Sequence, residues 1–197
     1  YSSAPDEGEE VYDWLLGWGE ISWLLEPLLA RDPARSILHL GCGNSALPED
    51  MYEAGYTEQV CVDISTAVVA QMAQRNALRP SIRWLAADCT DISELANDSF
   101  DLVIDKCTMD ALFCHDEHGL MIIKLVKEAF RVTAQRGVFI SISMHKPKTV
   151  LRFLKQRPFG WRVRMVPLPT ETSGKQRAGR PPQHHAYICA KQCAAAE

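Results

Sequence analysis

A glycine-rich turn behind a short apolar segment constrains the fold of this chain more than any other feature. The apolar segment 36–40 ends at Gly41, and a stretch that can begin a helix follows Gly43. Gly41 permits a tight turn, Gly43 lets the main chain approach a ligand, and a helix amino terminus presents unpaired N–H groups. A second apolar segment, 60–63, ends in Asp63, where the ribose hydroxyls of a nucleoside need an acceptor. Together these features predict a nucleoside-binding fold.

The rest of the chain alternates between helix-like and strand-like segments, which is typical of a parallel sheet. After the fifth strand, a short helix and two strands joined by a polar loop favour an antiparallel hairpin. We therefore predict an α/β fold: a three-layer Rossmann-like sheet, mostly parallel with a C-terminal antiparallel hairpin strand, which resembles the class I, seven-β-strand methyltransferases. The predicted helices are 11 to about 27–32, 48–54, 65–76, 116–134 and 148–156, and the predicted strands are 36–40, 60–63, 82–86, 100–104, 137–143, 160–168 and 186–190.

Length and composition favour one domain. The chain has 197 residues, 47% of them apolar, and we expect a single domain over 1–197. It comprises an N-terminal lid and helix (1–35), a cofactor-binding core (36–143), and a C-terminal helix and hairpin (144–197). The net charge of −4 suits a basic protein partner better than nucleic acid. No apolar run approaches the roughly 20 residues that span a bilayer, and we see no signal-peptide pattern. We expect a cytoplasmic monomer without membrane or nucleic-acid partners.

The cysteines are odd in number and form no Cys-x-x-Cys pair. Most lie in apolar, strand-like stretches, so we expect reduced, buried side chains and no metal site. The seven are Cys42, Cys61, Cys89, Cys107, Cys114, Cys189 and Cys193.

Tryptophan and histidine residues give less specific signals. Trp14, Trp18 and Trp23 lie at helical spacing, which favours core packing, although we assign Trp14 to the cofactor pocket. Three histidines of the C-terminal half are expected to be ordinary loop or strand residues rather than catalytic bases: His145, His184 and His185.

S-adenosylmethionine suits this layout because each part of the molecule meets a partner at a strand carboxyl end. The backbone at Gly41 and Gly43 approaches the methionine moiety and ribose, and Asp63 accepts hydrogen bonds from the ribose hydroxyls.

The adenine end of the cofactor is assigned to the residues that follow the second and third strands. Asp88 accepts from the exocyclic amine, the Cys89 N–H contacts the ring, and Ile64 packs on the base from the other side. Asp88 has an alternative role as the cap of a short helix over 91–96.

The loop after the fourth strand carries Asp105 and Lys106, which we place beside the methionine tail and the substrate entrance. Methyl transfer to an amine needs in-line alignment and a deprotonated nitrogen. Asp105 is our candidate to orient the amine or accept its proton; binding the cofactor ammonium and capping the loop stay open as alternatives. Lys106 has the alternative role of a solvated surface charge.

Several functions share these features. A methyltransferase for a small-molecule amine, thiol or hydroxyl uses the same cofactor half, and a catalytically silent scaffold would bind the cofactor without turnover. The segment 41–46 also nearly meets the Gly-x-Gly-x-x-Ala pattern of nicotinamide dehydrogenases. The closing hairpin and the absent substrate domain count against that last function.

Four motifs give the chain a family resemblance. The segments 12–14, 40–45, 62–65 and above all 105–112, Asp-Lys-Cys-Thr-Met-Asp-Ala-Leu, resemble the seven-β-strand lysine methyltransferases that include the elongation factor 1-alpha and citrate synthase enzymes. The resemblance implies S-adenosylmethionine as cofactor and a protein lysine, such as one of elongation factor 1-alpha, as acceptor. It implies cofactor contacts at Tyr1, Trp14, Gly41, Asp63, Ile64, Asp88, Cys89 and Lys106.

The chain departs from that family at two places. Tyr1 resembles the last residue of an aromatic Tyr-Trp-Asp-x-x-Tyr lid whose other residues this sequence does not contain. Cys107 stands where the family has glycine, so we expect a stiffer loop and a reshaped acceptor channel.

Overall fold

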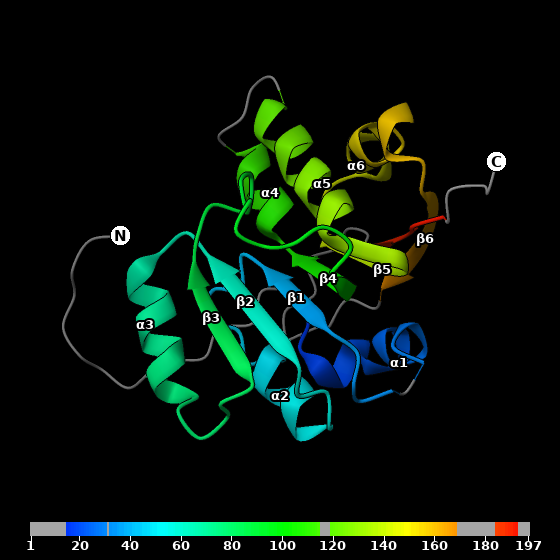
Figure 1. The fold of residues 1–197 in the computed structure, drawn as a ribbon. Coiled ribbons are helices and arrows are strands. Elements are labelled where there is room, and N and C mark those ends of the chain that lie inside the picture. Colours follow the sequence, from blue (N-terminus) through cyan, green and yellow to red (C-terminus); the bar gives the residue numbers. More distant parts are fainter. Residues whose placement is uncertain (1–14, 31, 115–118, 169–183, 193–197) are drawn as a thin grey trace, which may run out of the picture.

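A computed structural model describes residues 15–30, 32–114, 119–168 and 184–192. The predictions for Tyr1, Trp14, Cys193 and most of the loop that precedes the last strand lie outside the described residues. The fold is built around one mixed sheet with helices on both faces (Figure 1).

The sheet has seven strands in the order β3-β2-β1-β4-β5-β7-β6. The first five in the chain run parallel, whereas β7 pairs antiparallel with both β5 and β6. The predicted fold class and the C-terminal antiparallel pair are therefore confirmed. The strands are β1 (Ile37–Leu40), β2 (Gln59–Asp63), β3 (Ile82–Ala86), β4 (Phe100–Lys106), β5 (Thr133–Ser143), β6 (Arg162–Leu168) and β7 (His184–Ala190).

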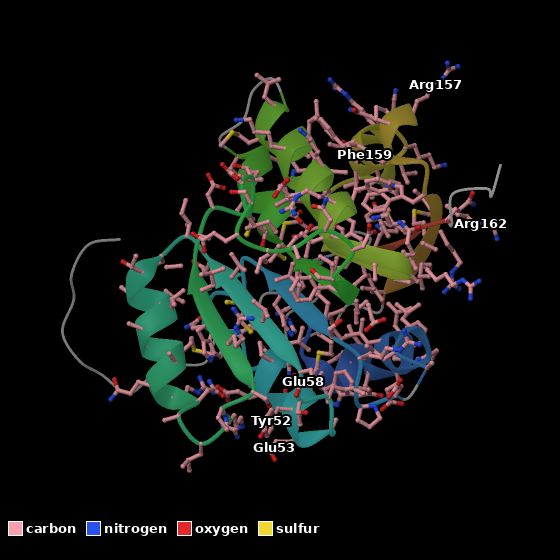
Figure 2. All side chains as sticks on the ribbon, viewed as in Figure 1. Tyr52, Glu53, Glu58, Arg157, Phe159 and Arg162 are labelled. Atoms are coloured by element: carbon pink, nitrogen blue, oxygen red, sulfur yellow. The ribbon has the colours of Figure 1, made fainter. Side chains whose placement is uncertain are left out.

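The helices form the two outer layers. They are α1 (Trp18–Leu28), α2 (Leu47–Glu53), α3 (Thr66–Arg75), α4 (Thr108–Phe113), α5 (Leu120–Val132) and α6 (Pro147–Leu154), followed by the short 3₁₀ helix η1 (Arg157–Phe159). One apolar cluster joins α1 and α2 to the sheet, and the other joins α4, α5, α6 and η1 to its opposite face. Figure 2 shows Tyr52 and Glu53 of α2 on one side of the sheet and Arg157 and Phe159 of η1 on the other.

Alternation along the strands explains why both faces are apolar. Val103 and Ile104 follow each other on β4 and are buried in opposite clusters, as expected for successive side chains of a strand. Because parallel strands are covered by helices on both faces, nearly every central-strand position must be apolar. Among the residues that the structure describes, no helix combines the length and apolarity needed to cross a membrane.

Local signals set several helix boundaries. Ser65 caps α3, since its Oγ accepts from the Val68 N–H at 3.3 Å, as the sequence indicated. Gly55 follows α2 with a φ of +100°, a conformation that favours glycine. Two predictions were wrong: residues 91–96 form turns instead of a helix, and Trp23 is 53% exposed on α1 instead of packed in the core.

The cysteine prediction was correct for only part of the set. Cys61, Cys89 and Cys189 are buried, but Cys42 and Cys107 are half-buried and Cys114 is exposed. All six described cysteines carry free thiols. In the part of the chain that the structure describes, no cluster of metal-ligating side chains is present.

Candidate cofactor site

The glycine turn is held against the start of α4. Thr108 Oγ1 donates a hydrogen bond to the Leu40 carbonyl at 2.7 Å, directly beneath the turn. Gly41 has a φ of +61°, and a Cβ there would overlap the Thr108 side chain. Gly41 is therefore required by an intramolecular contact, which joins the Gly-Cys-Gly and Asp-Lys-x-Thr motifs. The sequence predicted the tight turn but not Thr108 as its partner.

Gly43 has a different reason to be glycine. Its φ is +54°, and no atom of the described residues other than Gly43 itself and its two chain neighbours lies within 4 Å of the position that a Cβ would take. The Gly43 N–H donates to Asp63 Oδ2 at 2.8 Å, and the Ser65 N–H donates to Asp63 Oδ1 at 2.9 Å. The half-buried carboxylate is thus fixed at the end of β2 with acceptor capacity left on both oxygens. An open cradle beside an oriented carboxylate fits the ribose of a nucleoside cofactor.

The residues assigned to adenine lie at the ends of β2 and β3. Ile64 follows Asp63 and is 73% exposed, a large apolar side chain without a described cover. Asp88 Oδ1 accepts from the Thr90 N–H at 2.8 Å and so stabilises a turn, not the predicted helix. Cys89 is buried, and burial raises the pKa of its thiol, which stays protonated. Their contacts with adenine stay predictions.

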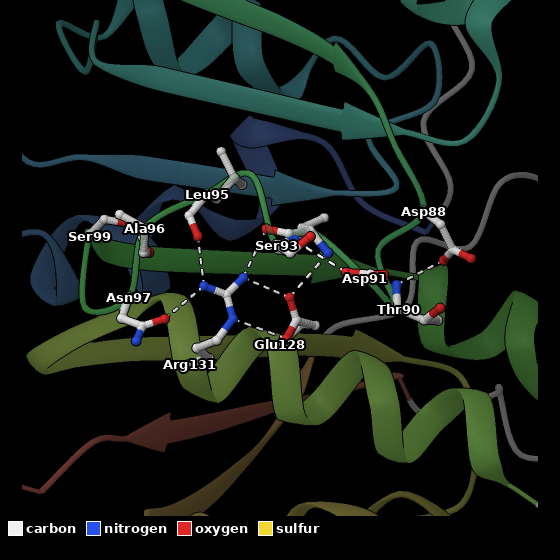
Figure 3. A network of polar contacts seen from close by, with 11 residues as sticks. Asp88, Thr90, Asp91, Ser93, Leu95, Ala96, Asn97, Ser99, Glu128 and Arg131 are labelled. Carbon is white, nitrogen blue, oxygen red and sulfur yellow. Dashed lines mark hydrogen bonds and ion pairs between the residues drawn. The ribbon is translucent and has the colours of Figure 1, made fainter.

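An arginine network anchors the loop that carries Asp88 and Cys89 (Figure 3). Arg131 of α5 donates to the carbonyls of Ile92 and Leu95 at 2.8 and 2.6 Å and pairs with Glu128 at 2.7 Å. Glu128 in turn accepts from the Ile92 N–H at 3.1 Å. The hydrogen bond from Arg131 lowers the pKa of the Glu128 carboxyl. The loop has little regular structure of its own, so these bonds fix its backbone on α5.

Asp105 is fully buried at the end of β4. Its Oδ1 accepts from the Thr108 and Met109 N–H groups at 2.9 and 3.1 Å, and its Oδ2 accepts from Ser141 Oγ at 2.7 Å. Desolvation by burial raises the pKa of Asp105 to about 7, although these three hydrogen bonds oppose the rise. The hydrogen bonds from Thr108 and Met109 agree with the alternative role of Asp105, which is to cap the loop before α4. A direct catalytic role for Asp105 stays a prediction.

Lys106 and Cys107 follow Asp105 in the turn to α4. Lys106 is half-buried, and its predicted contact with the cofactor is not tested by the geometry. Cys107 has a φ of +69°, in the left-handed region, which explains why glycine is favoured at this position. Burial raises the pKa of the Cys107 thiol to about 12.

A carboxylate–imidazole pair lies at the same edge of the sheet. Asp110 of α4 is 6% exposed, and its Oδ1 lies 2.6 Å from His145 Nδ1, just after β5. The same oxygen accepts from Ser143 Oγ at 3.0 Å and from the Met144 N–H at 3.1 Å. No local sequence pattern indicates this pair, because its members are 35 positions apart.

A surface hollow of about 600 Å³ lies elsewhere, at the edge where β4 and β5 begin. It is lined by residues such as Asp98, Lys127, Phe130 and Lys191. None of the residues predicted to bind the cofactor lines it, so it is a separate feature of the surface.

Comparison with known proteins identifies the family to which the chain belongs. Residues 38–141 match the family model described as a methyltransferase domain. The chain belongs to the S-adenosylmethionine-dependent methyltransferases. The matched segment runs from β1 to β5 and contains the glycine turn, Asp63, Asp88 and Asp105. The predicted family and cofactor class are confirmed.

Curated relatives of this methyltransferase share about a third of its residues. It is 33% identical over 172 residues to EEF1A lysine methyltransferase 4 of Mus musculus, covering 83% of this chain and 66% of the relative. It is 31% identical over 159 residues to eEF1A lysine and N-terminal methyltransferase of Danio rerio, covering 80% of this chain and 22% of the relative. The chain therefore spans about two-thirds of the first relative and about a fifth of the second.

Solved structures confirm the fold of this methyltransferase at low identity. N-methyltransferase NodS of Bradyrhizobium japonicum, crystallised with S-adenosyl-L-homocysteine, superimposes with a TM-score of 0.63 at 14% identity. The match covers 86% of this chain and 84% of that one. Sequences this different can share one fold because a core tolerates extensive hydrophobic substitution when its volume and patterning are kept.

Proposed function

We propose that this chain transfers a methyl group from S-adenosylmethionine to a lysine side chain of a protein, with elongation factor 1-alpha as the acceptor to test first. The similarity to EEF1A lysine methyltransferase 4 over 83% of the chain carries the proposal. The open cradle at Gly43 and the fixed carboxylate of Asp63 support cofactor binding at the strand carboxyl ends.

The protein's own groups have distinct parts in this function. Gly43, Asp63, Ile64, Asp88, Cys89 and Lys106 are proposed to hold the cofactor. When bound, S-adenosylmethionine supplies an activated methyl group on a sulfonium. The protein must align the acceptor nitrogen and exclude water, because an in-line displacement depends on orientation. We further propose that the chain works as one domain over 1–197 and as a monomer in the cytoplasm, without membrane or nucleic-acid partners.

Calorimetry tests the cofactor part of the proposal. We expect S-adenosylhomocysteine to bind with one site per chain and NADH not to bind. Asp63→Asn replaces one acceptor oxygen by a donor and should weaken binding at least tenfold, since a hydrogen bond to a charged group contributes about 1.5–3 kcal/mol. Asp91→Asn, an exposed carboxylate on the neighbouring loop, is the matched control and should bind as the unchanged chain does.

Radiolabel transfer tests the acceptor. With labelled S-adenosylmethionine and a cell lysate that contains elongation factor 1-alpha, we expect one labelled protein band. Cofactor binding with label only in small molecules would favour the small-molecule methyltransferase, and binding without any transfer would favour a silent scaffold. NADH binding alone would contradict the proposal.

A further inference from the structure

The carboxyl edge of the sheet holds a second polar cluster that the cofactor contacts do not use. Ser141 and Ser143 lie two residues apart on β5 and therefore point to the same face. Asp105 binds the first serine, and Asp110 binds the second, one step closer to the edge. His145 completes the series beyond the end of the strand, where its ring is one-third exposed. The cluster thus leads from a buried carboxyl to an accessible imidazole.

The imidazole of His145 is oriented from two sides. An ionised Asp110 carboxylate can only accept, so Nδ1 donates at the 2.6 Å contact, and in the neutral imidazole Nε2 then keeps its lone pair. Phe113 of α4 packs on the ring, with centroids 4.5 Å apart and planes at 36°. Since three donors converge on one Asp110 oxygen, the carboxylate itself is fixed. A carboxylate that holds the Nδ1–H tautomer leaves Nε2 as a proton acceptor.

Buried polar atoms without a hydrogen-bond partner lie in the cluster and beside it. Asp110 Oδ2 and the hydroxyl of the fully buried Tyr187 have no hydrogen-bond partner among the described residues, and neither has His184 Nδ1. His184 and Tyr187 come from β7, whose residue His185 pairs with Ser143 at the same edge. Buried polar groups without partners are uncommon and mark places where a water or a ligand group is expected.

The cluster adjoins the candidate cofactor site. Thr108, which contacts the glycine turn, lies in the same helical turn of α4 as Asp110. Met144, 46% exposed, and Phe113 provide apolar surface beside the imidazole, where the methylene stem of a lysine can pack. This arrangement places a proton acceptor at the edge where open α/β sheets bind their ligands.

We propose that His145, oriented by Asp110, is the catalytic base that removes a proton from the acceptor ammonium before methyl transfer. The inference rests on the proposed function. An N–H bond of the substrate breaks, its electron pair stays on the substrate nitrogen, and the proton forms a new bond to Nε2. The imidazolium is then balanced by the Asp110 carboxylate and releases its proton to water through its exposed edge. His145 touches the substrate, whereas Asp110 is a positioning residue.

Single-turnover transfer measures the role of His145. His145→Ala should lower the rate about 100-fold or more, the usual contribution of a general base, with S-adenosylhomocysteine affinity within twofold. Lys148→Ala removes an exposed side chain three positions along the chain, at the start of α6, and serves as the control. A rate for His145→Ala equal to that of the unchanged chain would overturn the inference. So would a loss of S-adenosylhomocysteine binding, because it would indicate a structural role.

Rescue and pH dependence separate a base from a structural residue. Added imidazole should restore the His145→Ala rate at least tenfold. Without a base only the unprotonated amine reacts, so the variant's rate should rise about tenfold per pH unit towards the lysine pKa of about 10.4. The titratable groups near the pair are Asp105, Cys107, His184 and Tyr187, each of which interacts electrostatically with Asp110. Parallel pH profiles for variant and unchanged chain, or no rescue, would contradict the inference.

A measurement without turnover tests the orientation. Nitrogen-15 NMR of the unchanged chain should show His145 protonated at Nδ1 and unprotonated at Nε2; the opposite tautomer would overturn the inference. Asp110→Asn should lower kcat with little change in KM. If the unchanged chain binds S-adenosylhomocysteine but methylates no protein lysine, the proposed function fails. If it methylates lysine and His145→Ala does so equally well, only the role of His145 fails.

Discussion

Two buried titratable groups are expected to act on stability in opposite directions as pH changes. Asp105 is fully buried with a pKa raised to about 7 from 3.8. Between these values the folded chain keeps a proton that the unfolded chain has lost, so Asp105 stabilises the fold at acid pH and loses that contribution as pH rises. At 1.36 kcal/mol per unit, the shift corresponds to about 4 kcal/mol.

His39 changes the pH dependence of stability in the opposite direction. It is buried on β1, with Nε2 at 2.7 Å from Gln59 Oε1, and burial lowers its pKa to about 4 from 6.5. In this range the unfolded chain holds the proton and the folded chain does not, so stability is present above pH 6.5 and is lost as pH falls through 4. The shift corresponds to about 3 kcal/mol. The two groups therefore nearly cancel between pH 4 and 6.5.

Asp105→Asn should remove one side of this balance. The asparagine Oδ1 can still accept from the Thr108 and Met109 N–H groups, and its amide can donate to Ser141 Oγ. Relative to the unchanged chain, the variant should be equally stable at pH 4 and more stable by about 4 kcal/mol above pH 7. Its own stability should fall steeply in acid, because the loss due to His39 is no longer offset.

Urea unfolding followed by tryptophan fluorescence from pH 4 to 8 measures this difference. Groups other than position 105 contribute equally to both proteins, so they cancel in the comparison. Asp105→Ala is the control: it removes the acceptor for two N–H groups and should be less stable than Asp105→Asn by about 2 kcal/mol at every pH, because neither variant has a titrating group at position 105. A variant minus unchanged difference that stays flat from pH 4 to 8 would refute the reasoning.

Other expectations concern the turns and the loop of the cofactor site. Gly43→Ala should weaken S-adenosylhomocysteine binding at least tenfold in calorimetry but cost only about 1 kcal/mol in urea unfolding, whereas Gly41→Ala, which overlaps Thr108, should cost more stability than that. Cys107→Gly should stabilise the fold by about 1 kcal/mol, because glycine adopts the left-handed conformation of this position without steric strain. No gain of stability in urea unfolding would argue against strain at Cys107. Arg131→Ala should speed hydrogen exchange over residues 91–97 and destabilise the fold by about 2 kcal/mol; unchanged exchange would mean that the loop is held otherwise.

The strands were predictable because their determinants are local. Apolar runs of four to seven residues bounded by polar or glycine positions predicted β1 to β4 within about two residues, and the predicted β3 bounds agree with the structure. β5 begins at Thr133, four positions before its predicted start, since Thr133 pairs with Phe100 across a register shift. That pairing depends on a partner strand, and no local pattern reveals it.

Helix α4, which follows the Asp105 turn, was harder to predict. α4 is only six residues long and follows Cys107 in a left-handed conformation, so it has neither a side-chain cap nor a full amphipathic repeat. Trp23 fits a core stripe by spacing, yet its Nε1–H donates to the Glu20 carbonyl at 2.8 Å on the exposed face of α1. Asp63 was predictable from its place after a strand. The pairing of Asp110 with His145 depends on the alignment of β4 with β5.

Peptide mass spectrometry of purified elongation factor 1-alpha, incubated with this chain and S-adenosylmethionine, tests the central proposal most directly. We expect added methyl groups on one lysine, their loss when that lysine is replaced by arginine, and at least tenfold less product with Asp63→Asn. Elongation factor 1-alpha with no methylated lysine, in the presence of a chain that binds S-adenosylhomocysteine, would contradict it.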